Sequence, residues 1–121
     1  MMNIFIDSAD VDTIRDLFST KLINGVTTNP TLIMKSGRDP EDVYQELVDM
    51  GVPDISMEVV GNSDEMTQEG FRLAEKFKKH CTVKVPCSRE GLIACKALSD
   101  EGIRVNVTLI FDVAQAILSA K

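Results

Sequence analysis

The stretch Thr82-Val83-Lys84-Val85-Pro86 points to the fold of this chain. Valine and threonine are typical of a short buried strand, and Pro86 ends the run because proline cannot donate a backbone hydrogen bond to a sheet. The residues that follow, Ser88-Arg89-Glu90-Gly91, lead into a stretch whose apolar residues recur at helical spacing. The segment therefore predicts a strand over 82–85 followed by a helix, with Lys84 inside the strand.

The same strand–helix unit recurs along the chain. Short apolar runs are each followed by a segment of helical periodicity, at intervals of roughly 25 residues. We expect strands over 3–7, 25–30, 55–60, 82–85 and 103–109. We expect helices that begin after Ser8 or Asp10, at Pro40 behind Asp39, at Ser63, after Ser88 and at Asp112. Five such units without a linker predict an α/β fold with a parallel sheet.

The composition narrows the classes of function. The chain has 121 residues, 44% of them apolar, and a formal net charge of −6 at pH 7. An acidic chain with one tyrosine and no tryptophan is poorly suited to nucleic acid or an anionic membrane, so we expect neither as a partner. Small phosphorylated substrates stay open, because a local pocket can be positive on an acidic protein.

The chain has three cysteines, Cys81, Cys87 and Cys95, and a single histidine, His80. Their spacing matches no common zinc pattern, and one histidine argues against a histidine-based catalytic triad. The odd number of cysteines, together with the absence of a signal peptide and of an apolar run of about 18 residues, indicates a reducing cytosol. We therefore expect a cytoplasmic protein without a bound metal.

Polar residues share one position in the expected strands. Near the carboxyl end of each strand lie one or two of them: Asp7; Thr27 and Asn29; Glu58; Lys84; Asn106 and Thr108. Side chains alternate between the faces of a strand, so the apolar neighbours can face the helices while the polar ones face a barrel interior. Active sites lie at this end of (β/α)8 TIM barrels. The pattern predicts a TIM barrel with about five β/α units present.

Lys84 carries the most chemical information, since lysine is almost never fully buried without a partner. Burial disfavours the ammonium form, and the free amine that results is a nucleophile. Attack on a ketone gives an iminium, which draws electrons from the adjacent carbon–carbon bond and allows it to break. The structural alternative is a lysine at a strand end whose amine reaches solvent.

Glu58 and Asp7 are candidates for proton transfer. A retro-aldol reaction needs a base at a substrate hydroxyl, and the formation or hydrolysis of an iminium needs acid–base help, often through water. The structural alternative for either residue is an ion pair with Lys84, and for Asp7 it is also capping of the following helix. The amides and hydroxyls of the neighbouring strands can bind substrate hydroxyls or that water, or can satisfy backbone groups in loops.

Several motifs resemble the small-subunit transaldolase and fructose-6-phosphate aldolase family over nearly the whole chain. The most specific pair is Gly25-Val26-Thr27-Thr28-Asn29-Pro30 with Val83-Lys84-Val85-Pro86. The other matching motifs are Ile4-Phe5-Ile6-Asp7 with Ser8-Ala9-Asp10, Glu90-Gly91-Leu92, Asn106-Val107-Thr108 and Ala114-Gln115-Ala116.

The resemblance implies roles for single residues. Lys84 matches the family's Schiff-base lysine, Asp7 its acid–base aspartate on the first strand, and Glu58 the third-strand residue that acts through a catalytic water. Positions that contact the bound dihydroxyacetone unit or that water are matched by Thr27, Asn29, Asn106 and Thr108. No cofactor or metal is implied.

Two positions lie on the transaldolase side of the family. Transaldolases carry Glu on the third strand and Asn-x-Thr on the fifth, whereas the aldolase members carry Gln and a residue other than Asn; this chain has Glu58 and Asn106. The implied reaction transfers a dihydroxyacetone unit from a ketose phosphate to an aldose phosphate, as in the pentose phosphate pathway. An aldolase that cleaves fructose 6-phosphate is the nearest alternative.

The length departs from the family. A complete barrel needs eight units and typically about 200 residues or more. We expect residues 1–121 to form a single domain, the N-terminal portion of a TIM barrel, which is not a competent enzyme alone. We expect the full-length form to be a homo-oligomer. A non-catalytic half-barrel that associates with a second chain is the alternative from another class.

Overall fold

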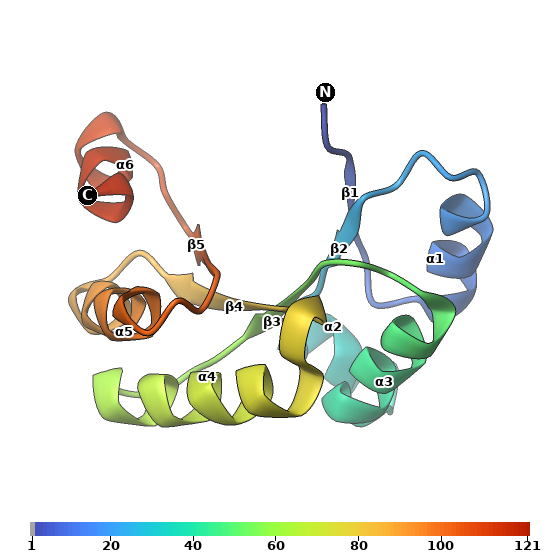
Figure 1. The fold of residues 1–121 in the computed structure, drawn as a ribbon, viewed down its shortest axis with the longest axis horizontal. Coiled ribbons are helices and arrows are strands. Elements are labelled where there is room, and N and C mark those ends of the chain that lie inside the picture. Colours follow the sequence, from blue (N-terminus) through green and yellow to red (C-terminus); the bar gives the residue numbers. More distant parts are fainter. Residues whose placement is uncertain (1) are drawn as a thin grey trace.

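The computed structural model describes residues 2–121, in which five parallel strands alternate with helices (Figure 1). The strands are β1 (Phe5–Asp7), β2 (Gly25–Thr27), β3 (Ile55–Glu58), β4 (Cys81–Pro86) and β5 (Val105–Thr108). The helices are α1 (Val11–Phe18), α2 (Pro30–Lys35), α3 (Pro40–Met50), α4 (Ser63–Phe77), the 3₁₀ helix η1 (Lys78–His80), α5 (Arg89–Asp100) and α6 (Val113–Ala120). The strand order β1-β2-β3-β4-β5 follows the sequence, and every neighbouring pair is parallel.

The sheet curls into an open trough (Figure 1). Helices α1 to α5 lie along its convex side, whereas α6 follows β5 at one margin of the trough. The outer strands β1 and β5 each pair with a single neighbour among the described residues. None of the helices within residues 2–121 is long and apolar enough to cross a membrane. The architecture is an incomplete (β/α) barrel with five units, which confirms the fold class expected from the sequence.

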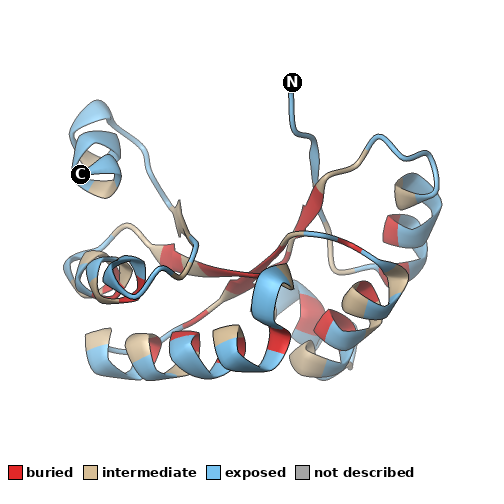
Figure 2. Cartoon of the chain, viewed as in Figure 1, coloured by how far each residue is buried: buried red, intermediate tan, exposed pale blue. Residues whose placement is uncertain are grey.

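The hydrophobic core lies between the convex face of the sheet and the helices that cover it. Figure 2 shows buried positions along the strands and on the helix sides that face them. The core includes Val26, Ile55, Met57, Val83 and Val85 from the strands, with Ile14, Ile33, Leu47, Leu73 and Leu98 from the helices. Burial of one such aliphatic side chain contributes roughly 1.5–3 kcal/mol. The apolar residues of the strands therefore pack against the helices on the convex side, and the concave face carries the polar residues of the strands.

Most helix starts follow the capping residues that the sequence offers. Four expected residues accept backbone N–H groups at the N-termini of α1, α3, α5 and α6: Asp10, Asp39, Ser88 and Asp112. Helix α4 begins at Ser63, but its cap is Asn62. The Asn62 Oδ1 accepts a hydrogen bond from the Glu65 backbone N–H at 2.8 Å, and the Glu65 carboxylate accepts one from the Asn62 N–H at 3.1 Å. This reciprocal pair is a capping box.

The segment after β2 differs from the expectation. We expected Pro30 to stop the second strand, but it also begins the short helix α2, with Asn29 as the N-cap. Proline suits that position because the first turn of a helix leaves its N–H groups without helical partners. Strands β1, β3 and β5 are also shorter than the expected spans 3–7, 55–60 and 103–109.

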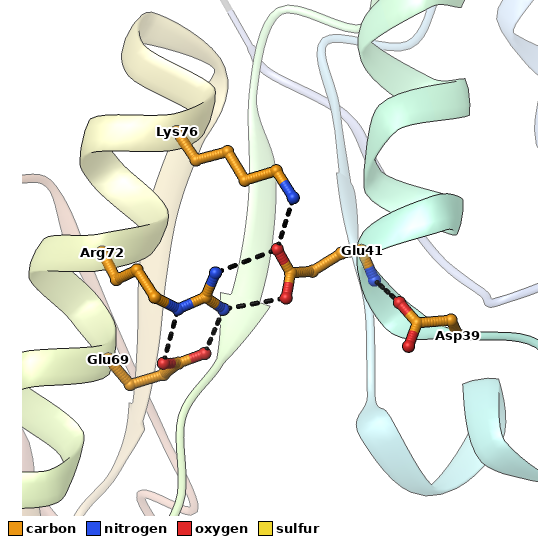
Figure 3. Close-up of polar contacts among 5 residues, drawn as sticks. All are labelled: Asp39, Glu41, Glu69, Arg72 and Lys76. Carbon is orange, nitrogen blue, oxygen red and sulfur yellow. Dashed lines mark hydrogen bonds and ion pairs between the residues drawn. The ribbon is translucent and has the colours of Figure 1, made fainter.

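A group of ion pairs joins α3 to α4 on the outer surface (Figure 3). Glu41 accepts hydrogen bonds from Arg72 at 3.0 and 2.9 Å and from Lys76 at 2.7 Å. Arg72 also pairs with Glu69 at 2.6 Å. The hydrogen bonds from Arg72, and then the one from Lys76, lower the pKa of Glu41 to about 2. The carboxylates of Glu69 and Glu41 in turn raise the pKa of Arg72.

Candidate active site

Side chains on each strand alternate between the core and the concave face. Those that pack toward the helices are Ile6, Val26, Thr28, Ile55, Met57, Val59, Val83, Val85, Val105 and Val107. The two-residue period of a strand then turns the intervening residues to the concave face: Asp7, Thr27, Ser56, Glu58, Thr82, Lys84, Asn106 and Thr108. Six of the seven residues proposed from the sequence are in this set, and Asn29 lies two residues after the end of β2.

Lys84 lies in the middle of a lateral row of three residues. Its Cα is in register with that of Glu58 on β3 and with that of Asn106 on β5. Val83 and Val85 are both 0% exposed in the core, which turns the partly exposed Lys84 side chain to the concave side. In the part of the chain that the structure describes, no ion pair joins Lys84 to Glu58. The strand register therefore brings a carboxylate and an amide to either side of an amine.

Asp7 approaches from the other margin of the trough. It ends β1, and its register runs through β2 to Ser56 on β3 and Thr82 on β4. Thr82 lies two residues before Lys84, so Asp7 is separated from the lysine by the width of β2 and β3. Asp10 rather than Asp7 caps α1, with its Oδ1 accepting from Asp12 N–H at 3.1 Å. The capping alternative for Asp7 is therefore wrong.

The polar residues at and just after the end of β2 differ in the face on which they lie and in the backbone groups that they bind. Thr28 is 0% exposed on the core side, and its hydroxyl donates to the Ser56 carbonyl at 2.8 Å. Thr27, on the concave side, donates to the Ile6 carbonyl at 3.5 Å. The Asn29 Oδ1 accepts from the Thr31 N–H at 2.8 Å and caps α2. That oxygen therefore satisfies a backbone group, which is the structural alternative considered for Asn29. Among the described residues, the Asn29 side-chain nitrogen makes no hydrogen bond.

Ser56 is a polar residue of this face that the sequence analysis did not select. Its side chain is only 1% exposed, and its Oγ accepts a hydrogen bond from the Asn106 amide nitrogen at 3.2 Å. That bond crosses β4 on the concave side. The available signal was a small polar residue inside a buried strand, two positions before Glu58, where alternation places both on one face.

The turn from β4 to α5 is packed tightly next to the lysine strand. A Cβ on Gly91 would lie 1.9 Å from the Pro86 carbonyl oxygen, so only glycine fits. The Ser88 hydroxyl accepts from the Gly91 N–H at 3.0 Å, and the Thr108 carbonyl accepts from the Cys87 N–H at 2.7 Å. These contacts fix the carboxyl ends of β4 and β5, where Lys84 and Thr108 lie.

A cleft of about 700 Å³ opens beside the carboxyl end of β1, with Asp7 on its wall. Its two arginines are already paired: Arg38 with Glu46 at 3.0 and 2.7 Å, and Arg15 with Asp12 at 3.1 Å. This cleft therefore offers no free guanidinium to an anionic ligand. Within residues 2–121, no cluster of three histidine, cysteine or acidic side chains could hold a metal ion.

The concave face combines groups that suit carbonyl chemistry. A primary amine can condense with a ketone, a neighbouring carboxylate can move protons directly or through water, and amides and hydroxyls can hold a polyhydroxylated ligand. Both acids lie on the same side of the lysine strand, Glu58 on the adjacent β3 and Asp7 further away on β1. The arrangement fits proton transfer and iminium formation on one substrate.

Comparison with known proteins gives a consistent result. The family described as Transaldolase/Fructose-6-phosphate aldolase matches residues 4–121. A "probable transaldolase" of Caulobacter vibrioides is 52% identical over 121 residues, which cover 99% of this chain and 55% of the relative. Proteins with the same description in Cereibacter sphaeroides and Paracoccus denitrificans are each 50% identical, with the same coverage. The chain thus spans about half the length of the curated relatives it matches.

Proposed function

Because the chain belongs to the transaldolase/fructose-6-phosphate aldolase family, we propose that its protein transfers a dihydroxyacetone unit from a ketose phosphate to an aldose phosphate. The observation that carries this proposal is the lateral row on the concave face, in which Lys84 lies between Glu58 and Asn106. A lysine on the core side, or one already paired with an acid, would argue against it.

The proposed reaction begins at the Lys84 amine. The amine attacks the keto carbon of the donor, and loss of water gives an iminium. Asp7 then takes the proton of the hydroxyl on the second carbon from the iminium carbon. The bond between that second carbon and the first one breaks, and an aldose phosphate leaves. The electron pair of that bond forms an enamine on the lysine nitrogen. Attack of the enamine on an acceptor aldehyde, followed by hydrolysis, completes the transfer.

The neighbouring residues have separate roles in this scheme. Glu58 moves protons through a water during formation and hydrolysis of the iminium. Thr27, Asn29, Asn106 and Thr108 bind the hydroxyls of the dihydroxyacetone unit or that water. The protein needs no cofactor or metal for this chemistry, since the iminium itself is the electron sink.

Two residues favour transferase over simple aldolase activity. Glu58 and Asn106 follow the transaldolase pattern, and the relatives described above carry the name "probable transaldolase". The alternative is an aldolase that releases free dihydroxyacetone from fructose 6-phosphate. We further propose a cytoplasmic homo-oligomer that acts in the pentose phosphate pathway.

The test is borohydride trapping with fructose 6-phosphate, in the longest natural protein that contains this chain, followed by peptide mass spectrometry. We expect a reduced dihydroxyacetone adduct on Lys84, and no adduct in the Lys84→Met variant. Product analysis with and without erythrose 4-phosphate separates the two activities. Free dihydroxyacetone as the main product under both conditions refutes transferase activity.

A further inference from the structure

Ser56 is the most enclosed polar side chain on the concave side of β3. It is 1% exposed and lies two residues before Glu58 on the same face. Its backbone is anchored from the neighbouring strand, because the Ser56 carbonyl accepts hydrogen bonds from the Thr28 backbone N–H at 3.2 Å and from the Thr28 hydroxyl at 2.8 Å. Ser56 is therefore held in place next to the row of Glu58, Lys84 and Asn106, on the side nearer the amino ends of the strands.

The hydroxyl of this fixed residue holds Asn106. The Asn106 amide nitrogen donates to Ser56 Oγ at 3.2 Å, and the bond spans β4 on the side of Lys84 nearer the amino end of the strand. A carboxamide without such a bond turns freely about its last side-chain torsion and exchanges its donor and acceptor. With the nitrogen tied to Ser56, the Asn106 Oδ1 is kept as the group that can accept a hydrogen bond.

We propose that Ser56 is a positioning residue that orients the Asn106 carboxamide beside Lys84. This inference rests on the proposed function. The nitrogen of an iminium or of its precursor carries an N–H, and a substrate hydroxyl carries an O–H; both need an acceptor. Without the Ser56 hydroxyl, the amide can turn and present its NH₂ to the same groups. Ser56 does not touch the substrate in this scheme, and it acts through Asn106.

Thr82 provides a matched control on the same face. It lies in register with Ser56, but its hydroxyl donates to Asp54 Oδ1 at 2.6 Å rather than meeting Asn106. The Thr82→Val variant therefore removes a nearby concave-side hydroxyl without freeing the carboxamide. Any effect that it shares with Ser56→Ala reflects general packing and not the orientation of Asn106.

A double-mutant cycle in the longest natural protein that contains the chain tests the inference. We expect Ser56→Ala to lower kcat roughly tenfold with little change in KM, and Ser56→Thr, which keeps a hydroxyl, to recover part of the loss. Combined with Asn106→Ala, the Ser56→Ala change should add nothing further, whereas Thr82→Val should show no coupling to Asn106. Additive effects of Ser56→Ala and Asn106→Ala overturn the proposal.

A structural readout separates this inference from the proposed function. If the wild-type protein forms no borohydride adduct, the proposed function fails. The positioning of Asn106 is still measured by NMR of its side-chain amide. We expect the Asn106 side-chain NH₂ group to have a high ¹⁵N order parameter in wild type and a lower one in Ser56→Ala, with unchanged far-ultraviolet circular dichroism. An Asn106 amide that is equally restrained in both proteins contradicts the inference.

Discussion

Glu58 and Lys84 occupy paired positions on adjacent parallel strands, on the face opposite the buried Val83 and Val85. In the described part of the chain no ion pair joins the two side chains, so the fold does not depend on a Glu58–Lys84 pair. An acid kept near an amine without neutralising it is free to exchange protons with water and substrate. The first two predictions follow from this relationship.

We expect Glu58→Gln to reduce turnover roughly 100-fold to 1000-fold, because an amide cannot relay protons through water. The Lys84 adduct should still form, only more slowly, since the amine is intact. Stopped-flow kinetics and borohydride trapping measure the two quantities. Glu101→Gln, at the exposed end of α5, is the control and should behave as wild type. Wild-type turnover in Glu58→Gln would remove Glu58 from the mechanism.

We expect Lys84→Met to abolish adduct formation without loss of stability. The described structure shows no ion pair for the Lys84 amine, so methionine removes no such contact and adds apolar surface on a partly exposed position. The free energy of unfolding should stay within about 0.5 kcal/mol of wild type or rise. Urea denaturation measures it. Lys96→Met, on the exposed side of α5, should keep the adduct. A loss of several kcal/mol on Lys84→Met would show that the lysine serves the fold.

The sequence predicted which face each strand turns to solvent, because the alternation of valine with Lys84, Asn106 and Thr108 permits one assignment in a helix-covered sheet. It could not reveal that Asn29 caps α2, since that role depends on Pro30 beginning a helix. The Ser56–Asn106 bond was equally hidden, because it joins residues 50 positions apart across an intervening strand. The alternation of apolar and polar residues along a strand predicts which face a side chain lies on. The residue with which that side chain forms a hydrogen bond depends on the register between strands, which the sequence does not show.

Gly91→Ala should destabilise the protein by about 2–3 kcal/mol, a typical cost of overpacking. The added Cβ would meet the Pro86 carbonyl at 1.9 Å, and this backbone atom cannot turn away as a side chain can. The shift also reaches the end of the lysine strand, so trapping at Lys84 should slow. Arg89→Ala, in the same turn but exposed, is the control. A wild-type melting temperature for Gly91→Ala would show that the helix can move away freely.

The ion pairs of Glu41 predict a pH dependence of stability (Figure 3). The pKa of Glu41 is lowered from 4.5 to about 2, chiefly by the Arg72 hydrogen bonds. Its contribution is therefore fully present above pH 4.5 and is lost as the pH falls through 2. Both partners are substantially exposed, and solvent screens them, so we expect Glu41→Gln to cost only about 1 kcal/mol at neutral pH.

Chemical denaturation of wild type and Glu41→Gln across pH 2 to 7 checks this dependence. The difference in the free energy of unfolding should shrink toward acid and also with added salt. Glu75→Gln is the control, because Glu75 is 83% exposed and its one ion pair within residues 2–121 is with Lys78. A difference between wild type and Glu41→Gln that grows on acidification would contradict the lowered pKa.

The margin of the trough at β5 and α6 predicts self-association of the 121-residue chain expressed alone. Helix α6 has no buried residue, and Phe111, Val113, Ile117 and Leu118 are between 61% and 83% exposed. Contiguous apolar surface next to an unpaired strand edge favours contact with another chain. Ile117→Glu should therefore shift light scattering toward the monomer. Met34→Glu, at an apolar residue of α2 that is at least as exposed as Ile117, should not. If the chain is monomeric at every concentration, this margin does not promote association.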